Sequence, residues 1–191
     1  MLNFADYFLR LKMSKLDQYN IQFSGLKAGK HEFEFKIGKD FFSHFENTDI
    51  DDANIEVYVD FEKNERYLAL DFHLEGTIQT VCDRCLDDLT IEIDYAPRLY
   101  VNFGDETSDL TDIDDTMVLS RSEDKIELAK HFYDYILLNM PIQRIHPEDE
   151  DGDSTCDPEM IEKIEKYEAG ENDQDNKETD PRWDKLKGLY N

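Results

Sequence analysis

The sequence predicts an α+β protein: an antiparallel, partly barrel-like sheet at about residues 19–102, followed by C-terminal helices and an acidic flexible tail. Three observations lead to this fold class. Apolar and polar residues alternate through the first half, which is typical of strands that bury one face and expose the other. Apolar residues then recur at helical spacing in later stretches. Finally, the segment ENDQDNKETD contains no apolar residue, and such a composition predicts disorder.

Four stretches of the first half alternate strictly, and each is expected to form a strand: HEFEFKIG, NIEVYVDFE, RYLALDFHLEG and LTIEIDYAP. Their apolar positions are Phe33, Phe35 and Ile37; Ile55, Val57, Val59 and Phe61; Leu68, Leu70, Phe72 and Leu74; and Leu89, Ile91, Ile93 and Tyr95. Asn64 lies between the second and third stretches, which favours a hairpin there. The stretch DFFSHFE is expected to form a short helix under the sheet.

The second half begins with an expected acidic loop at 103–116 and a short strand at 117–119. The stretch DKIELAKHFYDYILLNMP then predicts a helix over 124–140. Asp124 and Glu127 have the spacing of a capping box at its start, and the proline that follows it ends the helix.

The stretch DPEMIEKIEKYEAG predicts a second, more polar helix over 158–168. Asp157 is expected to be its N-cap, Pro158 to occupy its first position, and Gly170 to mark the C-terminal stop. We therefore expect one domain over 1–168 and an acidic disordered linker over 169–180.

The last segment, residues 181–191, is expected to be a short amphipathic motif. Trp183, Leu186 and Leu189 recur there at helical spacing and are candidate partner-binding residues. Because so short a helix is marginal in isolation, it needs a surface to dock on, which is either a groove of a partner or the protein's own domain. The sequence leaves both open.

The formal net charge of −25 and the pI near 4.3 bound the function. Because a surface this acidic repels phosphate backbones, strong direct binding to nucleic acid is not expected, and a basic protein partner is favoured. No secretory signal and no apolar run of about 20 residues is visible, so no membrane segment is expected. Three cysteines are an odd number for a disulfide framework, which favours a reducing compartment, the cytoplasm.

The stretch VCDRCLDDL holds two cysteines, Cys82 and Cys85, and three interpretations are open: metal ligands, a redox couple, or small buried side chains in a turn. A redox cysteine usually lies at a helix N-terminus, where its pKa is lowered, but here the flanking residues predict strands. Asp83, Asp87 and Asp88 are also expected to raise a thiol pKa.

The metal interpretation requires further ligands, and IHPEDEDGDSTC offers His146 and Cys156. Together with Cys82 and Cys85 they make three thiolates and one imidazole, which is a composition of closed structural zinc sites. The CxxC half is a good signal, whereas the long spacing of the other half is a weak one. A calcium loop is excluded, because its first and last ligand positions would be Pro147 and Pro158.

These motifs resemble the YceD family of large-subunit ribosomal RNA accumulation proteins. The resemblance rests on VCDRCLDDL, on a helix ending in NMPIQRIHPED, on the Cys-Asp-Pro that follows, and on the terminal DPRWDKLKGL, and it covers the chain from about Tyr19 onward. It implies a cytoplasmic, non-enzymatic factor. It also strengthens the prediction that Cys82, Cys85, His146 and Cys156 form a structural zinc site. The segment 147–180 departs from the family pattern: its 15 Asp and Glu and 3 Lys give −15 + 3 = −12, which argues against direct RNA contact.

We therefore expect a ribosome-biogenesis factor that binds a basic ribosomal protein or a pre-ribosomal particle. Arg84, inside the CxxC turn, could contact the partner or an acidic neighbour. Two alternatives are a thiol-disulfide oxidoreductase using Cys82 and Cys85, and a generic acidic metal-binding interaction protein. No phosphate loop or nucleophile motif supports an enzyme, and His131 is expected to be solvated on the polar side of its helix.

Overall fold

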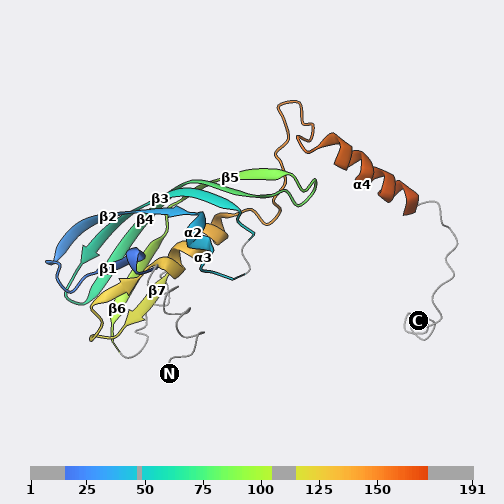
Figure 1. Ribbon diagram of the computed structural model, residues 1–191. Coiled ribbons are helices and arrows are strands. Elements are labelled where there is room, and N and C mark those ends of the chain that lie inside the picture. Colours follow the sequence, from blue (N-terminus) through green and yellow to red (C-terminus); the bar gives the residue numbers. More distant parts are fainter. Residues whose placement is uncertain (1–15, 47–48, 105–114, 172–191) are drawn as a thin grey trace, which may run out of the picture.

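The computed structural model describes residues 16–46, 49–104 and 115–171 (Figure 1). In chain order its elements are the 3-10 helix η1 (Asp17–Tyr19), β1 (Asn20–Gln22), β2 (Gly29–Gly38), α2 (Lys39–Phe42), β3 (Asp52–Lys63), β4 (Tyr67–Val81), β5 (Asp88–Tyr95), β6 (Arg98–Phe103), β7 (Thr116–Leu119), β8 (Lys125–Glu127), α3 (Ala129–Asn139) and α4 (Pro158–Glu171). This part of the chain is mixed α+β with a mostly antiparallel sheet, as predicted.

The main sheet has the strand order β2-β3-β4-β6-β7, and β5 pairs with β4 beside this path. The long strand β4 pairs with β6 near its start and with β5 over its second half. All pairings are antiparallel except that of β6 with β7. The predicted hairpin between β3 and β4 is confirmed, and the amide of Asn64 donates to the carbonyl of Tyr67 at 3.0 Å.

The barrel-like part of the prediction is wrong for the described residues, because the sheet does not close. β2 and β7 are the two ends of the strand path and do not pair with each other, while β1 and β8 form a separate two-stranded ribbon. Alternation along a strand reports which face is buried but not whether the outer strands meet, so the sequence could not decide between open and closed.

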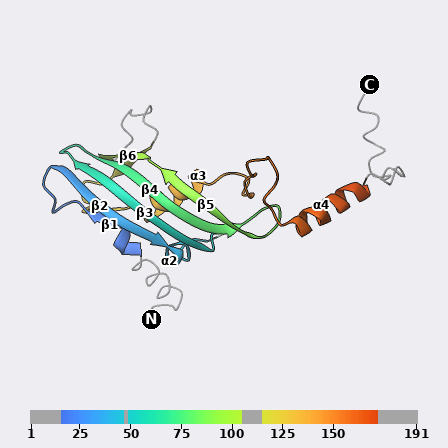
Figure 2. The same cartoon turned by 90° about the horizontal axis from the view of Figure 1, so that it is seen from above.

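The core lies between one face of this sheet and the helices α2 and α3, which pack on the same side (Figures 1 and 2). The alternation predicted these strands correctly: the positions named for β3, for β4 and for the first six residues of β5 are buried. From α3, Phe132 and Ile136 are fully buried. The expected short helix is α2, which contributes Phe41 and Phe42.

Helix α3 begins at Ala129, so the prediction of a helix from residue 124 is wrong at its start. Leu128 is the N-cap residue, without a side-chain cap, so the predicted capping box of Asp124 and Glu127 does not form. Instead, Lys125–Glu127 forms β8, and Ile126 pairs with Ile21 of β1. A single apolar residue between two polar ones fits a strand and a helix equally well, and tertiary pairing decides it.

Helix α4 confirms its predicted start, because Glu159 donates its amide to the carboxylate of Asp157 at 3.1 Å. It continues to Glu171, so the predicted end at 168 and the stop at Gly170 are wrong. Figure 1 shows α4 pointing away from the sheet. No described helix has the length and hydrophobicity of a membrane span.

Several predictions fall outside the described residues. These are most of the acidic loop at 103–116, the linker from 172 onward, and the motif 181–191 with Trp183, Leu186 and Leu189. The division into domain, linker and motif therefore stays a prediction.

Gly76 of β4 is held where no other residue fits, between Ile55 of β3 and Ile93 of β5. Its φ is +150°, and an added Cβ would lie 2.1 Å from the carbonyl oxygen of Asn54. We expect Gly76→Ala to lower the free energy of unfolding by about 2–4 kcal/mol, from backbone strain and overpacking.

Urea unfolding measures this effect. Gly25→Ala is the matched control, because an added Cβ at Gly25 meets nothing within 4 Å. Equal unfolding midpoints for the two variants would contradict the strain assigned to Gly76.

Candidate metal centre

The two CxxC cysteines lie in the turn that joins β4 to β5. The turn is closed by two backbone hydrogen bonds, from the amide of Cys82 to the carbonyl of Asp87 at 2.8 Å and from Leu86 to Cys82 at 3.0 Å. Leu86 has a φ of +65° and an exposed side chain. The side chains of Cys82 and Cys85 are buried, with 0% and 3% of their surface exposed. The turn therefore directs both sulfurs inward.

Arg144 attaches the segment after α3 to this turn. Its carbonyl accepts the amide of Asp83 at 2.7 Å, and its own amide donates to the Asp83 carboxylate at 2.9 Å. Its guanidinium donates to the same carboxylate at 2.9 Å and to Asp49 at 3.3 Å. The Arg144 amide and side chain lower the pKa of Asp83. This clamp sets the position of His146, two residues further along.

His146 is oriented for metal binding through Nδ1. Its Nε2 lies 3.1 Å from the carbonyl oxygen of Asp88. Because a carbonyl only accepts, Nε2 carries the proton, and in the neutral ring Nδ1 is then a free acceptor. Nδ1 lies 3.3 Å from the sulfur of Cys85. A histidine whose other nitrogen donates to a carbonyl is the usual arrangement of a metal ligand.

Cys156 reaches the site because the acidic loop before it folds back on itself. Glu148 and Ser154 form a β-bridge, and the hydroxyl of Thr155 donates to the carbonyl of Pro147 at 2.6 Å. The Asp149 carboxylate accepts the amides of Asp151 and Asp153, so it serves the loop itself. The long spacing from His146 to Cys156 is thus taken up by a compact turn.

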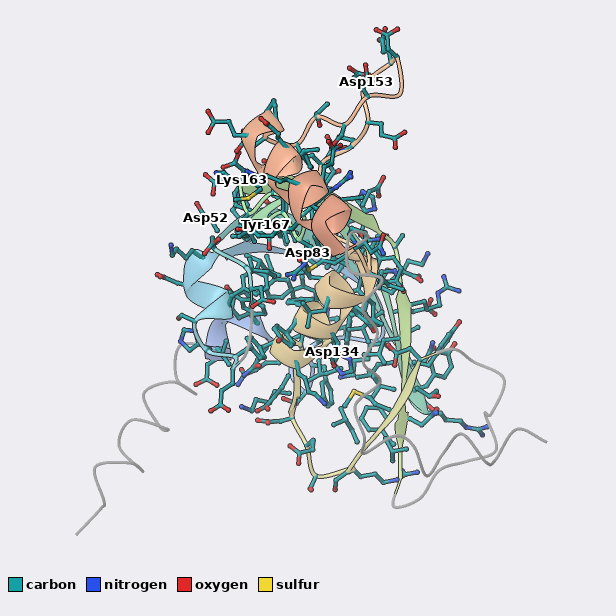
Figure 3. The ribbon with its side chains drawn as sticks, turned by 90° about the vertical axis from the view of Figure 1, so that its right-hand side faces the viewer. Asp52, Asp83, Asp134, Asp153, Lys163 and Tyr167 are labelled. Atoms are coloured by element: carbon teal, nitrogen blue, oxygen red, sulfur yellow. The ribbon has the colours of Figure 1, made fainter. Side chains whose placement is uncertain are left out.

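The four candidate ligand atoms of Cys82, Cys85, His146 and Cys156 lie within 4.8 Å of one another. The sulfurs of Cys82 and Cys156 are 3.9 Å apart. Tetrahedral zinc with ordinary bond lengths separates its ligand atoms by roughly 3.5–3.8 Å, so the cluster is near that size. Figure 3 views the molecule from this end, with α4 nearest the viewer and Asp83 behind it.

The surroundings favour the ionised form of two thiols. Burial alone would raise the pKa of Cys82, but hydrogen bonds from the backbone at Cys85, Arg84 and His146 lower this pKa to about 6. The hydroxyl of Ser154 lowers the pKa of Cys156, whereas burial raises that of Cys85. The expectation that nearby aspartates raise these pKa values is therefore wrong for Cys82.

Arg84 is exposed, and its amide faces the sulfur of Cys82 at 3.5 Å. Among the residues that the structure describes, none forms an ion pair with its side chain. Its partner-binding role stays a prediction.

The residues that sequence reasoning missed are Arg144, Asp49 and Asp88, whose contacts run through backbone atoms or across distant segments. The one available signal was the arginine two positions before His146.

Fold and site together define a small α+β protein in which a largely buried Cys3His cluster joins the β4–β5 turn to the segment before α4. The chain belongs to the YceD family: residues 70–190 match the family of the large ribosomal RNA subunit accumulation protein YceD. This match includes all four cluster residues and the terminal DPRWDKLKGL, but it begins well after Tyr19, where the motifs had placed the start of the resemblance. No curated protein and no solved structure matches the chain.

Proposed function

We propose that this protein supports accumulation of large-subunit ribosomal RNA without catalysis, by binding a basic ribosomal protein or an assembly intermediate that contains one. The family ties the chain to large ribosomal RNA accumulation. The observation that carries the choice of partner is the charge on the outer face of the sheet.

The outer face of the sheet places carboxylates directly opposite one another on neighbouring strands. Glu56 faces Glu75, and Glu75 also faces Asp94. Asp60 faces Asp71. Like charges in directly opposed cross-strand positions are destabilising, so a cationic partner would relieve the repulsion, whereas a phosphate backbone would add to it. Charge complementarity of this kind speeds encounter and weakens with salt.

We further propose that Cys82, Cys85, His146 and Cys156 hold one structural zinc ion. Three soft thiolates and an imidazole favour zinc over calcium or magnesium. Four protein ligands leave no position open for a substrate, as in structural rather than catalytic sites. The ion would hold the segment after α3, and the start of α4, against the β4–β5 turn.

The lowered pKa of Cys82 would also suit a thiol-disulfide oxidoreductase. In such enzymes the reactive cysteine gains its low pKa at a helix N-terminus or beside cations, whereas Cys82 lies between two strands. Disulfide reductase activity that is lost in Cys82→Ser would favour the enzyme. Many weak cation sites instead of one tight zinc would favour a generic acidic metal-binding protein.

Affinity capture from cell lysate tests the proposed partner. The full chain should retain basic ribosomal proteins of the large subunit, and their recovery should fall as salt rises. The triple variant Asp60→Asn, Glu75→Gln, Asp94→Asn should recover several-fold less. The control with the same change of charge is Glu159→Gln, Glu162→Gln, Glu165→Gln on α4. Recovery of RNA without ribosomal proteins, persisting at high salt, would contradict the proposal.

Replacing Arg144 tests the clamp on the proposed zinc site. Arg144→Ala removes the guanidinium that positions the His146 segment, and loss of such an outer contact typically weakens metal affinity about 10–100-fold. Competition with a chromophoric chelator measures this. Arg98→Ala is the control, because Arg98 pairs with Asp71 on the outer face. Equal zinc affinity in both variants would show that the clamp plays no part.

A further inference from the structure

A second site lies away from the metal centre, in an open groove between α3 and the β5–β6 connection. The groove has a volume of about 810 Å³, and none of the four cluster residues lines it. Small-ligand sites commonly have volumes of this order. Its walls combine tyrosine rings with carboxylates, a pairing that suggests a cationic ligand.

The aromatic wall consists of Tyr95, Tyr100 and Tyr135. The rings of Tyr95 and Tyr135 meet edge to face, with centroids 6.1 Å apart. His131 lies 6.0 Å from the Tyr135 ring and is half-buried, so the expectation that it is solvated is wrong. Burial lowers its pKa, which keeps the imidazole neutral near pH 7 and free of repulsion toward a cation.

Two carboxylates of the groove form no ion pair with a lysine or arginine of the described residues. Asp115 accepts a hydrogen bond from the hydroxyl of Tyr135, and Asp134 lies on α3 (Figure 3). No lysine or arginine in residues 16–46, 49–104 and 115–171 forms an ion pair with either. The groove therefore carries uncompensated negative charge beside aromatic faces.

Among the described residues that line the groove, Arg98 is the one cation, and it is already neutralised. Its guanidinium is bidentate to Asp71, with Nη2 2.7 Å from the carboxylate, and this pairing raises its pKa further. The same guanidinium lies 5.8 Å from the Tyr100 ring centroid. Arg98 is thus unavailable to a phosphate. It also illustrates, within the protein, a guanidinium held between a carboxylate and a tyrosine.

We propose that this groove binds an arginine side chain of a basic protein partner. Tyrosine faces attract a guanidinium by cation–π interaction, and the planar fork matches a carboxylate with two charge-assisted hydrogen bonds. The inference rests on the proposed function only in taking the partner to be a basic protein. It assigns to that partner one anchoring residue, in a groove that borders the outer sheet face at Arg98.

Titration of the full-length protein with N-acetyl-arginine methylamide tests this, followed by amide chemical shifts. Saturable shifts are expected at Tyr95, Tyr100, His131 and Asp134. The neutral isostere N-acetyl-citrulline methylamide should give none. Asp134→Asn should weaken binding at least fivefold, whereas the matched charge change Glu162→Gln on exposed α4 should leave it unchanged.

Equal shifts with the citrulline compound would overturn the proposal, and so would equal weakening in both variants, which would show attraction by net charge alone. Tighter binding of a short single-stranded RNA at the same residues would also overturn it. Capture of ribosomal proteins that is unaffected by Asp134→Asn would refute the groove while the proposed function stands. Arginine binding without any captured protein would support the groove and refute that function.

Discussion

Replacing Cys156 by serine is expected to reduce bound zinc from one ion per chain to less than a tenth of that. Serine does not supply the thiolate that completes the set of four, and the sulfur of Cys82 loses its neighbour at 3.9 Å. Structural zinc contributes about 10–16 kcal/mol to zinc-finger peptides, but here the sheet has its own core. The loss should therefore loosen residues 141–171 rather than unfold the protein.

Elemental analysis of the natively purified protein measures the metal, and hydrogen exchange measures the loosening. The amides of Asp83 and Arg144, which bond across the clamp, should exchange faster in Cys156→Ser, while β3 and β4 stay protected. Asp153→Asn, in the exposed part of the same loop, is the control and should keep its zinc. Full zinc occupancy in Cys156→Ser would refute the four-ligand site.

Phe132→Ala is expected to lower the free energy of unfolding by about 3–5 kcal/mol, the usual cost of removing a buried phenylalanine ring. Phe132 is fully buried, and its ring centroid lies 5.3 Å from that of Phe35 and 6.0 Å from that of Phe72. The substitution therefore opens a cavity where α3 meets the sheet. Chemical denaturation measures the change.

The control on the same helix is Leu138→Ala. Leu138 is 73% exposed, so its removal should change stability by no more than about 0.5 kcal/mol. A change below about 1 kcal/mol for Phe132→Ala would mean that α3 does not hold the sheet as described.

The strands were predictable because the alternation in β3 and β4 extends over many residues, so that Val57 or Leu70 has only one consistent face. The start of α3 could not be predicted, because β8 is three residues long and its one apolar side chain, Ile126, fits a strand pattern as well as a helix pattern. The pairing that decides it comes from Ile21, about a hundred residues earlier in the chain. Whether the sheet closes into a barrel could not be predicted for the same reason, because closure depends on edge strands that meet only in the folded protein.

The candidate site was predicted by residue type rather than by spacing. The turn between β4 and β5 explains why Cys82 and Cys85 face inward, and alternation on both sides indicated that turn. The approach of Cys156 depends on a folded acidic loop, and the orientation of His146 depends on the carbonyl of Asp88. Neither leaves a pattern in the sequence, because backbone atoms make the decisive contacts.

The order of the four proposed zinc ligands along the chain has a consequence for synthesis. Cys156 follows Cys82 by 74 residues, which at about 5–20 residues per second corresponds to roughly 4–15 seconds of translation. The growing polypeptide therefore presents two thiols at the tip of β4 for seconds before the remaining ligands leave the ribosome. Assembly of the proposed zinc site would then be a late step of synthesis, and a chain released before residue 146 would carry only two of the four proposed ligands.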